Sequence, residues 1–97
     1  MTVKVIGLIQ LTDELAFEQY RSQVGKTVEH YKGSVEYRGS LTGIFWNELS
    51  CEAFTAYVEL RFPCKEDAKA WAHSTEYQSL LGVRNQAMRL TLFGVEN

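Results

Sequence analysis

The chain is organised around an alternating stretch that leads directly into a helix. Over residues 54–62, apolar side chains occupy every second position, and side chains with polar tips occupy the positions between them. This period of two is typical of a strand with one face in the core. Pro63 lacks a backbone N–H, so we expect the strand to end there and Cys64 to take the N-cap position of a helix. The helix that carries Trp71 can then cover the apolar face.

Apolar residues spaced by three and four positions predict a longer helix nearer the N-terminus. They are Phe17, Tyr20, Val24, Val28 and Tyr31. Thr12 or Asp13 can cap the start of this helix, and Gly33 can end it in a left-handed conformation. The second helical pattern, which follows Cys64, restarts or continues over residues 76–84. The chain therefore carries two helical regions, each preceded by a predicted strand.

Three further stretches predict strands, over residues 3–11, 34–45 and 87–95. The first is partly apolar on both faces, which is typical of a central strand covered on both sides. The element order is then βαββαβ. We predict an α+β fold of the ferredoxin-like type, in which a four-stranded antiparallel sheet carries both helices on one face.

The other face of this sheet has no helix to cover it. On it we place Ile6, Leu8, Tyr57 and Phe93 among the charged residues Glu36, Arg38, Glu59, Arg61 and Arg89. An apolar patch of several hundred Å² usually marks an interface. We therefore predict a homodimer whose two sheets pack face to face and enclose a barrel-like space.

Size and composition limit the remaining possibilities. Ninety-seven residues suffice for a single domain, which we assign to residues 1–97. The net charge of -2 offers no overall positive field for nucleic acid or an anionic membrane, and no apolar run approaches the roughly 20 residues of a membrane span. We expect a cytoplasmic protein. Cys51 and Cys64 flank the predicted strand over residues 54–62 and lie too far apart for an internal disulfide.

Several short motifs resemble those of a known family. They are Arg38-Gly39, Phe62-Pro63, the stretch from Ala68 to Trp71, Ser74, Glu76-Tyr77 and Arg84. Over nearly the whole chain they resemble a family of small bacterial proteins of unknown function within the dimeric α/β-barrel superfamily. Cys64, Thr75 and Ser40 depart from the serine, proline and glycine common in such proteins. The resemblance implies a ferredoxin-like fold and a dimer, and it implies no settled activity.

Candidate site residues gather around the break in the second helical region. They are His73, Glu76, Tyr77 and Arg84, which could converge with Arg38 from the sheet on an acidic ligand group. An arginine fork suits a carboxylate, whereas histidine or tyrosine can move a proton. The candidate catalytic residues are therefore His73 and Tyr77, and the candidate ligand-binding residues are Arg38, Tyr57, Trp71 and Arg84.

The same residues also have structural interpretations. Trp71 and Tyr77 are good core anchors, Glu76 can occupy the first turn of a helix, and Arg84 can brace that turn. Cys64 can be a reactive thiol at a helix N-terminus or a simple replacement for a capping serine, and we favour the second. These alternatives stay open at the level of sequence.

Other classes of site find little support. His73 and Glu76 alone make a poor metal site, and no glycine pattern matches a phosphate loop or a dinucleotide fingerprint, so we expect neither a metal nor a cofactor. RNA-recognition domains share the βαββαβ order. However, Thr55 stands where a stacking ring would be needed, and the net charge is unsuitable.

The sequence therefore predicts a homodimeric α/β-barrel protein that binds a small organic molecule. It leaves open whether the protein is an enzyme. One possibility is cofactor-independent acid/base or oxidative chemistry on a small organic acid or lactone-like compound. The alternative is a non-catalytic binding or regulatory homodimer.

Overall fold

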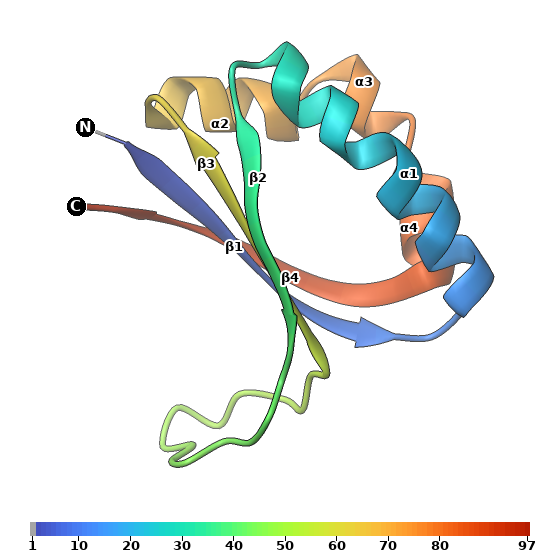
Figure 1. Cartoon of the computed structure of the whole chain (residues 1–97), viewed down its shortest axis with the longest axis vertical. Coiled ribbons are helices and arrows are strands. Elements are labelled where there is room, and N and C mark those ends of the chain that lie inside the picture. Colours follow the sequence, from blue (N-terminus) through green and yellow to red (C-terminus); the bar gives the residue numbers. More distant parts are fainter. Residues whose placement is uncertain (1) are drawn as a thin grey trace.

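The computed structural model of the protein describes residues 2–97 and has the ferredoxin-like topology. Its elements are β1 (Val3–Leu11), α1 (Glu14–His30), β2 (Ser34–Ser40), β3 (Ala56–Phe62), α2 (Lys65–Ala72), α3 (Thr75–Gln78), α4 (Leu81–Ala87) and β4 (Met88–Glu96). The antiparallel sheet has the order β2-β3-β1-β4. All four helices lie on one side of it (Figure 1). The predicted α+β fold class is confirmed.

The core lies between the helices and one face of the sheet. On β1, Val3, Val5 and Ile9 are buried on this face, whereas Ile6 and Leu8 point the other way and are half-buried. Gly7 shares the covered face, and a Cβ atom there would lie only 2.6 Å from Cγ1 of Val58. Because Gly7 has no side chain, side chains of the neighbouring strands can occupy the space above it.

Helix α1 begins and ends through specific local interactions. The Asp13 carboxylate caps it by accepting a hydrogen bond from the Ala16 N–H at 3.0 Å, which holds the pKa of Asp13 below its ordinary value. At the other end, Lys32 rather than Gly33 takes the left-handed conformation, with φ of 71°. The prediction that Gly33 adopts the left-handed conformation was therefore wrong. Gly33 is needed for space, because a Cβ there would lie 2.6 Å from the Phe62 ring.

The second helical region is divided into three short helices instead of one restarted helix. Ser74 stands at the first break, where its hydroxyl donates to the Trp71 carbonyl at 2.7 Å and accepts from the Tyr77 N–H at 3.0 Å. This one side chain therefore provides hydrogen-bond partners for a free carbonyl at the end of α2 and a free N–H at the start of α3. The predicted segment over residues 76–84 is therefore interrupted by a further break between α3 and α4.

A β-bulge in β2 corrects the predicted faces of that strand. The pairing with β3 shifts between Val35 and Tyr37: these two residues lie two positions apart in β2, but their partners Leu60 and Glu59 are adjacent in β3. Strand β2 therefore has one extra residue at this point. Arg38 consequently pairs with Val58 and shares its helix-covered face, whereas Tyr37 lies on the bare face and is 60% exposed. We had placed Arg38 on the bare face. The prediction was wrong because one extra residue reverses the alternation beyond it.

The segment between β2 and β3 projects away from the body of the molecule. The predicted strand over residues 34–45 ends at Ser40, and residues 41–55 form an extended arm (Figure 1). The strand predicted from residue 54 starts at Ala56. The arm carries the most exposed large apolar side chains of the described chain, which are Phe45, Trp46 and Leu49.

Two smaller expectations can be compared with the structure. Cys51 and Cys64 are both free, so the predicted absence of a disulfide is confirmed. Cys64 occupies the N-cap position of α2 without a side-chain capping bond, and its thiol donates to Asp67 at 3.3 Å instead. Within residues 2–97, no helix has the length and apolar character needed to cross a membrane.

Two glycines with different surroundings provide a test of this packing. We expect Gly33→Ala to lower the free energy of unfolding by about 1 to 3 kcal/mol, because Phe62 and Val28 are fully buried and cannot yield to an added methyl group. Gly25→Ala, which meets no atom within 4 Å, should instead raise it by up to about 1 kcal/mol through helix propensity. Urea unfolding followed by circular dichroism measures both. Equal effects of the two variants would contradict the packing described here.

Candidate functional site

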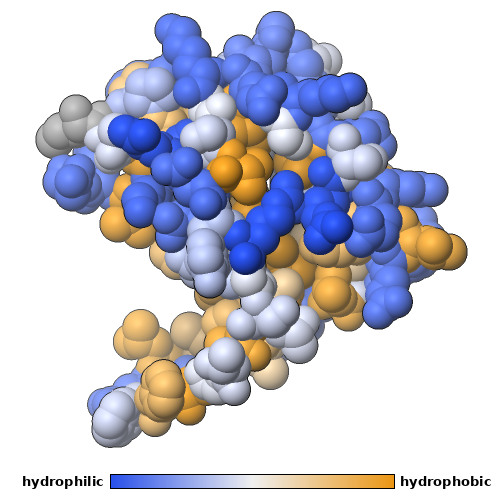
Figure 2. Space-filling model, in the orientation of Figure 1, coloured by the Kyte–Doolittle hydropathy of each residue, from blue (hydrophilic) through white to orange (hydrophobic). Residues whose placement is uncertain are grey.

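A cavity of about 310 Å³ lies between α1 and the covered face of the sheet. Its walls are mostly apolar. They comprise Ile9, Leu11, Phe17, Tyr20, Arg21, Val24, Arg38, Gly39, Ser40, Ala56, Tyr57, Val58, Leu60, Trp71, Met88, Leu90 and Leu92. Figure 2 shows apolar surface framed by hydrophilic side chains between β2 and α1. A largely apolar cavity of this size with a few polar groups is typical of small-molecule sites.

Two arginines reach this cavity from different elements. Arg21 comes from α1, and Arg38 comes from β2 through the bulge that turns it towards the helices. Partial burial of Arg38 lowers its pKa, and repulsion by the nearby Arg21 lowers it further. Arg21 lies 3.5 Å from Glu18. Among residues 2–97, no carboxylate forms an ion pair with Arg38, so two like charges share one side of the cavity without full compensation.

A chain of hydroxyl groups leads from the cavity wall into the core. The hydroxyls of Tyr20 and Tyr77 lie 2.9 Å apart, and Arg84 donates to the Tyr77 hydroxyl at 3.1 Å. Tyr20 is buried, which raises its pKa well above the ordinary value, and the adjacent Tyr77 adds to this effect. The Tyr20 hydroxyl is therefore neutral at physiological pH. It is positioned as a hydrogen-bonding group, with Tyr77 and Arg84 behind it.

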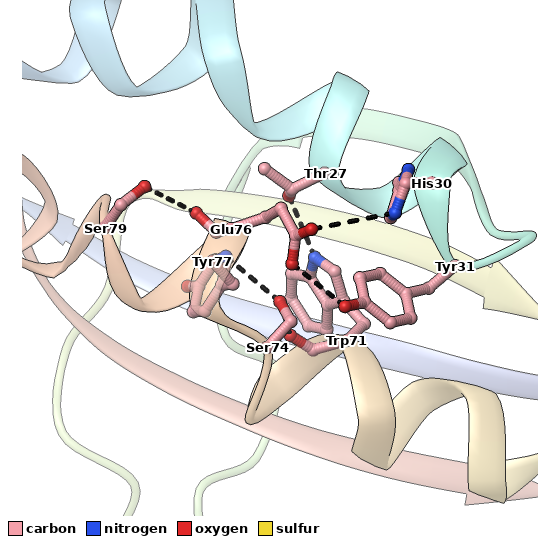
Figure 3. Close-up of polar contacts among 8 residues, drawn as sticks. All are labelled: Thr27, His30, Tyr31, Trp71, Ser74, Glu76, Tyr77 and Ser79. Carbon is pink, nitrogen blue, oxygen red and sulfur yellow. Dashed lines mark hydrogen bonds and ion pairs between the residues drawn. The ribbon is translucent and has the colours of Figure 1, made fainter.

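Trp71 anchors α2 beside the cavity. Its ring is almost fully buried, and its indole N–H donates to the Thr27 hydroxyl of α1 at 3.0 Å (Figure 3). The same view shows Glu76 of α3 reaching α1, where it accepts from the Tyr31 hydroxyl at 2.9 Å and lies 3.6 Å from His30. These contacts join the start of α3 to the end of α1. Glu76 thus has a structural role at the first turn of its helix.

The structure separates the predicted site residues into groups. Arg38, Tyr57 and Trp71 all contribute to the cavity wall. Tyr77 and Arg84 lie behind Tyr20 and are connected to the wall through the hydroxyl chain. His73 is exposed at the C-cap of α2, and it is not part of the wall. The four residues His73, Glu76, Tyr77 and Arg84 therefore do not all converge on one ligand group. Tyr77 and Arg84 contact each other, whereas Glu76 contacts Tyr31 and His30, and His73 is exposed.

Tyr57 lies at the boundary between the two faces of the sheet. Its hydroxyl donates to Glu59 at 2.9 Å, and Glu59 also accepts from Lys4 at 2.9 Å, on the bare face. The bond from Lys4, followed by the one from Tyr57, lowers the pKa of Glu59. Tyr57 thus belongs to the cavity wall by position while its hydroxyl is engaged on the opposite side. Within residues 2–97, no group of three or more histidine, cysteine or acidic side chains could hold a metal ion.

Sequence reasoning missed two residues of the cavity. Tyr20 was assigned to the apolar stripe of α1, which is correct for the helix, and Arg21 was not singled out as a site residue. Only the position of β2 brings the two residues to one cavity. The available signal was a tyrosine within a stripe otherwise rich in aliphatic residues, since a buried hydroxyl needs a hydrogen-bond partner.

The whole chain from β1 onwards matches one protein family. A family model described as a domain of unknown function, DUF1330, covers residues 3–97. The chain belongs to the DUF1330 family. The resemblance seen in the sequence motifs is thereby confirmed. No curated protein matches the chain.

Solved structures support the same fold. A protein of unknown function from Rhodopseudomonas palustris superposes with a TM-score of 0.76 at 13% identity, over 99% of this chain and 82% of that one. A dimeric ferredoxin-like protein of unknown function from a Jannaschia species gives 0.68 at 12% identity and covers both chains completely. SnoaB from Streptomyces nogalater, a cofactor-independent oxygenase, gives 0.72 at 5% identity over 99% and 92%. At these identities, the likeness establishes the fold of this DUF1330 protein and nothing further.

The hydroxyl chain can be tested by a double-mutant cycle. We expect Tyr20→Phe and Tyr77→Phe each to lower the free energy of unfolding by about 1 to 2 kcal/mol, because each removes a buried hydrogen bond. Tyr77→Phe leaves the Tyr20 hydroxyl without this partner, and Tyr20→Phe leaves the Tyr77 hydroxyl with Arg84 alone. The double variant should lose less than the sum, with a coupling of about 1 kcal/mol. Denaturant unfolding of the four proteins measures this coupling. Strict additivity would show that the two hydroxyls do not interact.

Proposed function

We propose that this DUF1330 protein is a homodimer that binds a small organic acid in the cavity between α1 and the sheet. The observation that carries the proposal is the pair Arg21 and Arg38 beside an apolar cavity, with no acid of residues 2–97 forming an ion pair with Arg38. Both arginines are exposed at the rim of the cavity, where an anion can reach them, and the planar fork of an arginine suits a carboxylate. A ligand can supply the negative charge that the described chain does not.

The cavity also indicates the rest of the ligand. Leucine, isoleucine, valine and methionine side chains dominate the walls away from the arginines, so the body of the ligand is apolar. The volume of about 310 Å³ suits a compact molecule with one ring or a short branched chain. The Tyr20 hydroxyl can form one hydrogen bond to a carbonyl or hydroxyl group of this body. The sequence-based roles of Arg38 and Trp71 as binding residues form part of this proposal.

The homodimer rests on the face of the sheet that the helices leave bare. Ile6 and Leu8 lie there half-buried, and Phe93 is 43% exposed beside them. Association of two such faces would remove this apolar surface from water. The solved Jannaschia relative of this fold is itself described as dimeric.

Cofactor-independent chemistry is a second candidate. It is favoured by the buried hydroxyl chain, since a ligand bound to Tyr20 could exchange a proton along Tyr77, which was one of the predicted catalytic residues. SnoaB is a cofactor-independent oxygenase with the same fold. The catalytic role predicted for His73 would require a ligand that extends beyond the cavity wall. Binding without turnover remains the primary proposal, because the cavity offers recognition groups and Tyr20 is not ionised.

A ligand screen tests the binding proposal. We expect some small aromatic or branched aliphatic carboxylates to raise the melting temperature in a thermal-shift assay, whereas their amides should not. Arg38→Gln should weaken binding of the same carboxylates at least about tenfold, because a charge-assisted contact is lost. Mass spectrometry of the ligand after incubation separates binding from turnover.

Two control variants sharpen this test. Lys26→Gln removes an equal charge from the exposed side of α1, away from the cavity wall, and should leave ligand affinity unchanged. His73→Gln tests the predicted role of that residue, and unchanged affinity and turnover would remove it. If Lys26→Gln weakened binding as much as Arg38→Gln, the effect would be one of net charge and the proposed site would fail.

The dimer has its own test. We expect Leu8→Glu to weaken self-association at least about tenfold, because it places a carboxylate in the centre of the bare face. Leu15→Glu changes a leucine that is 79% exposed on α1 and should have no such effect. Sedimentation equilibrium measures both. A wild-type chain that stays at 11.1 kDa at micromolar concentration would refute the dimer.

A further inference from the structure

The tip of the arm is held in shape while its apolar side chains face solvent. The Asn47 amide donates to the Cys51 carbonyl at 2.9 Å and its oxygen accepts from the Cys51 N–H at 2.8 Å. Ser50 closes the same turn with φ of 56°. Around this turn, Phe45, Trp46 and Leu49 are 82 to 90% exposed. A turn fixed by its own hydrogen bonds presents these three side chains as a ready contact surface.

The root of the arm is tied to the end of the sheet. The Leu41 N–H donates to the Thr55 carbonyl at 2.8 Å, and the Thr55 N–H donates to the Ile9 carbonyl at 2.9 Å. From this root the arm turns to the side that the helices leave bare (Figure 1). The sheet and the arm therefore form two sides of an open angle, which appears as a notch in the surface in Figure 2.

The inside of this angle is incompletely filled, and its lining is partly apolar and partly polar. Leu8 and Phe54 line a hollow of about 350 Å³ between the arm and the sheet, together with the polar residues Gln10, Glu52 and Arg89. Phe93 and Val95 continue the apolar surface along β4 and are 43% and 51% exposed. The three large apolar side chains on the arm and the apolar side chains of the bare face both lack cover within one chain.

The charges of the two surfaces are complementary. The arm, residues 41–55, contains Glu48 and Glu52 and has no lysine or arginine. The bare face carries the three basic residues Lys4, Arg61 and Arg89 on β1, β3 and β4. Its acids are Glu59 on β3 and Glu36 at the bulge of β2, beside Ser34. One such contact already exists within the chain, where Arg89 lies 3.2 Å from Glu52. An acidic arm does not suit an anionic lipid surface, but it does suit the bare face of another copy.

We propose that the arm is a clasp between two copies of this chain, in which Phe45, Trp46 and Leu49 of one protomer pack onto the bare sheet face of its partner. The inference rests on the proposed homodimer and adds to it the segment that secures the interface. A twofold dimer makes each contact twice, so both arms and both hollows are used. Aromatic side chains such as Phe45 and Trp46 are common anchors of interfaces.

The clasp also connects the interface to the cavity. Ser40, just before the arm, and Ala56, just after it, both line the cavity wall. An arm held by the partner would fix the position of this wall. Loss of the clasp should therefore lower ligand affinity even though no arm residue from 42 to 54 lines the cavity.

Trp46 provides a direct reporter, since the chain has only one other tryptophan, the buried Trp71. In the variant Trp71→Phe, we expect Trp46 emission to shift to shorter wavelength and acrylamide quenching to fall as the protein concentration rises through the dimerisation range. If Trp71→Phe does not fold, the difference between wild type and Trp46→Phe gives the same signal. Trp46 that stays fully quenchable in a dimer would overturn the clasp.

A matched pair of variants completes the test. Phe45→Ser combined with Trp46→Ser should weaken the dimer at least tenfold by sedimentation equilibrium, whereas Leu15→Ser on the exposed side of α1 should not. A wild-type monomer at all concentrations would defeat the proposed dimer and the clasp together. A dimer unaffected by the arm variants would defeat the clasp alone. Protection of Trp46 only after addition of phosphatidylcholine vesicles would assign the arm to a membrane and overturn the proposal.

Discussion

A run of aromatic contacts holds the helices to the sheet at one end of the molecule, and the rest of the structure depends on it. The rings of Phe62 and Trp71 lie 5.5 Å apart, those of Trp71 and Tyr77 lie 4.4 Å apart, and Tyr77 meets Tyr20 edge-on at 6.4 Å. These large side chains fill the space between the layers near the start of β1. Smaller side chains such as Ala56 and Leu90 occupy the other end, and the layers stay separated over the cavity. The same packing thus creates the core and the cavity.

The chemistry of the cavity depends on a single extra residue. The bulge after Val35 turns Arg38 from the bare face to the covered face and brings it near Arg21. Without the bulge, the cavity would have one arginine, and Tyr37 would point towards α1 in place of Arg38. Bulges often redirect a side chain next to a functional site. The proposed recognition of an acid therefore follows from the register of one edge strand.

The protein also leaves two apolar surfaces that one chain cannot cover. The bare sheet face is a consequence of having helices on one side only, and the arm adds Phe45, Trp46 and Leu49 on that same side. Each surface exposes apolar area to water in an isolated chain. The two surfaces lie close together and differ in charge. In a twofold dimer, the arm of each copy can cover the bare face of the other, so one type of contact covers both surfaces in both copies. The cavity wall, which adjoins the root of the arm at Ser40 and Ala56, would then depend on the partner for its stability.

The sequence by itself determined the fold. Alternation over residues 54–62, the stop at Pro63 and the stripe from Phe17 to Tyr31 are local patterns, and local patterns suffice where each element buries one face. Trp71 and Tyr77 were likewise identifiable as core anchors. The cavity was decided only by tertiary structure. Arg38 was placed on the wrong face because a bulge has no signature in the alternation pattern, and Tyr20 reaches Tyr77 only after residues 57 positions apart are packed together. Contacts between distant residues are set by the packing of layers, which a pattern along the chain does not contain.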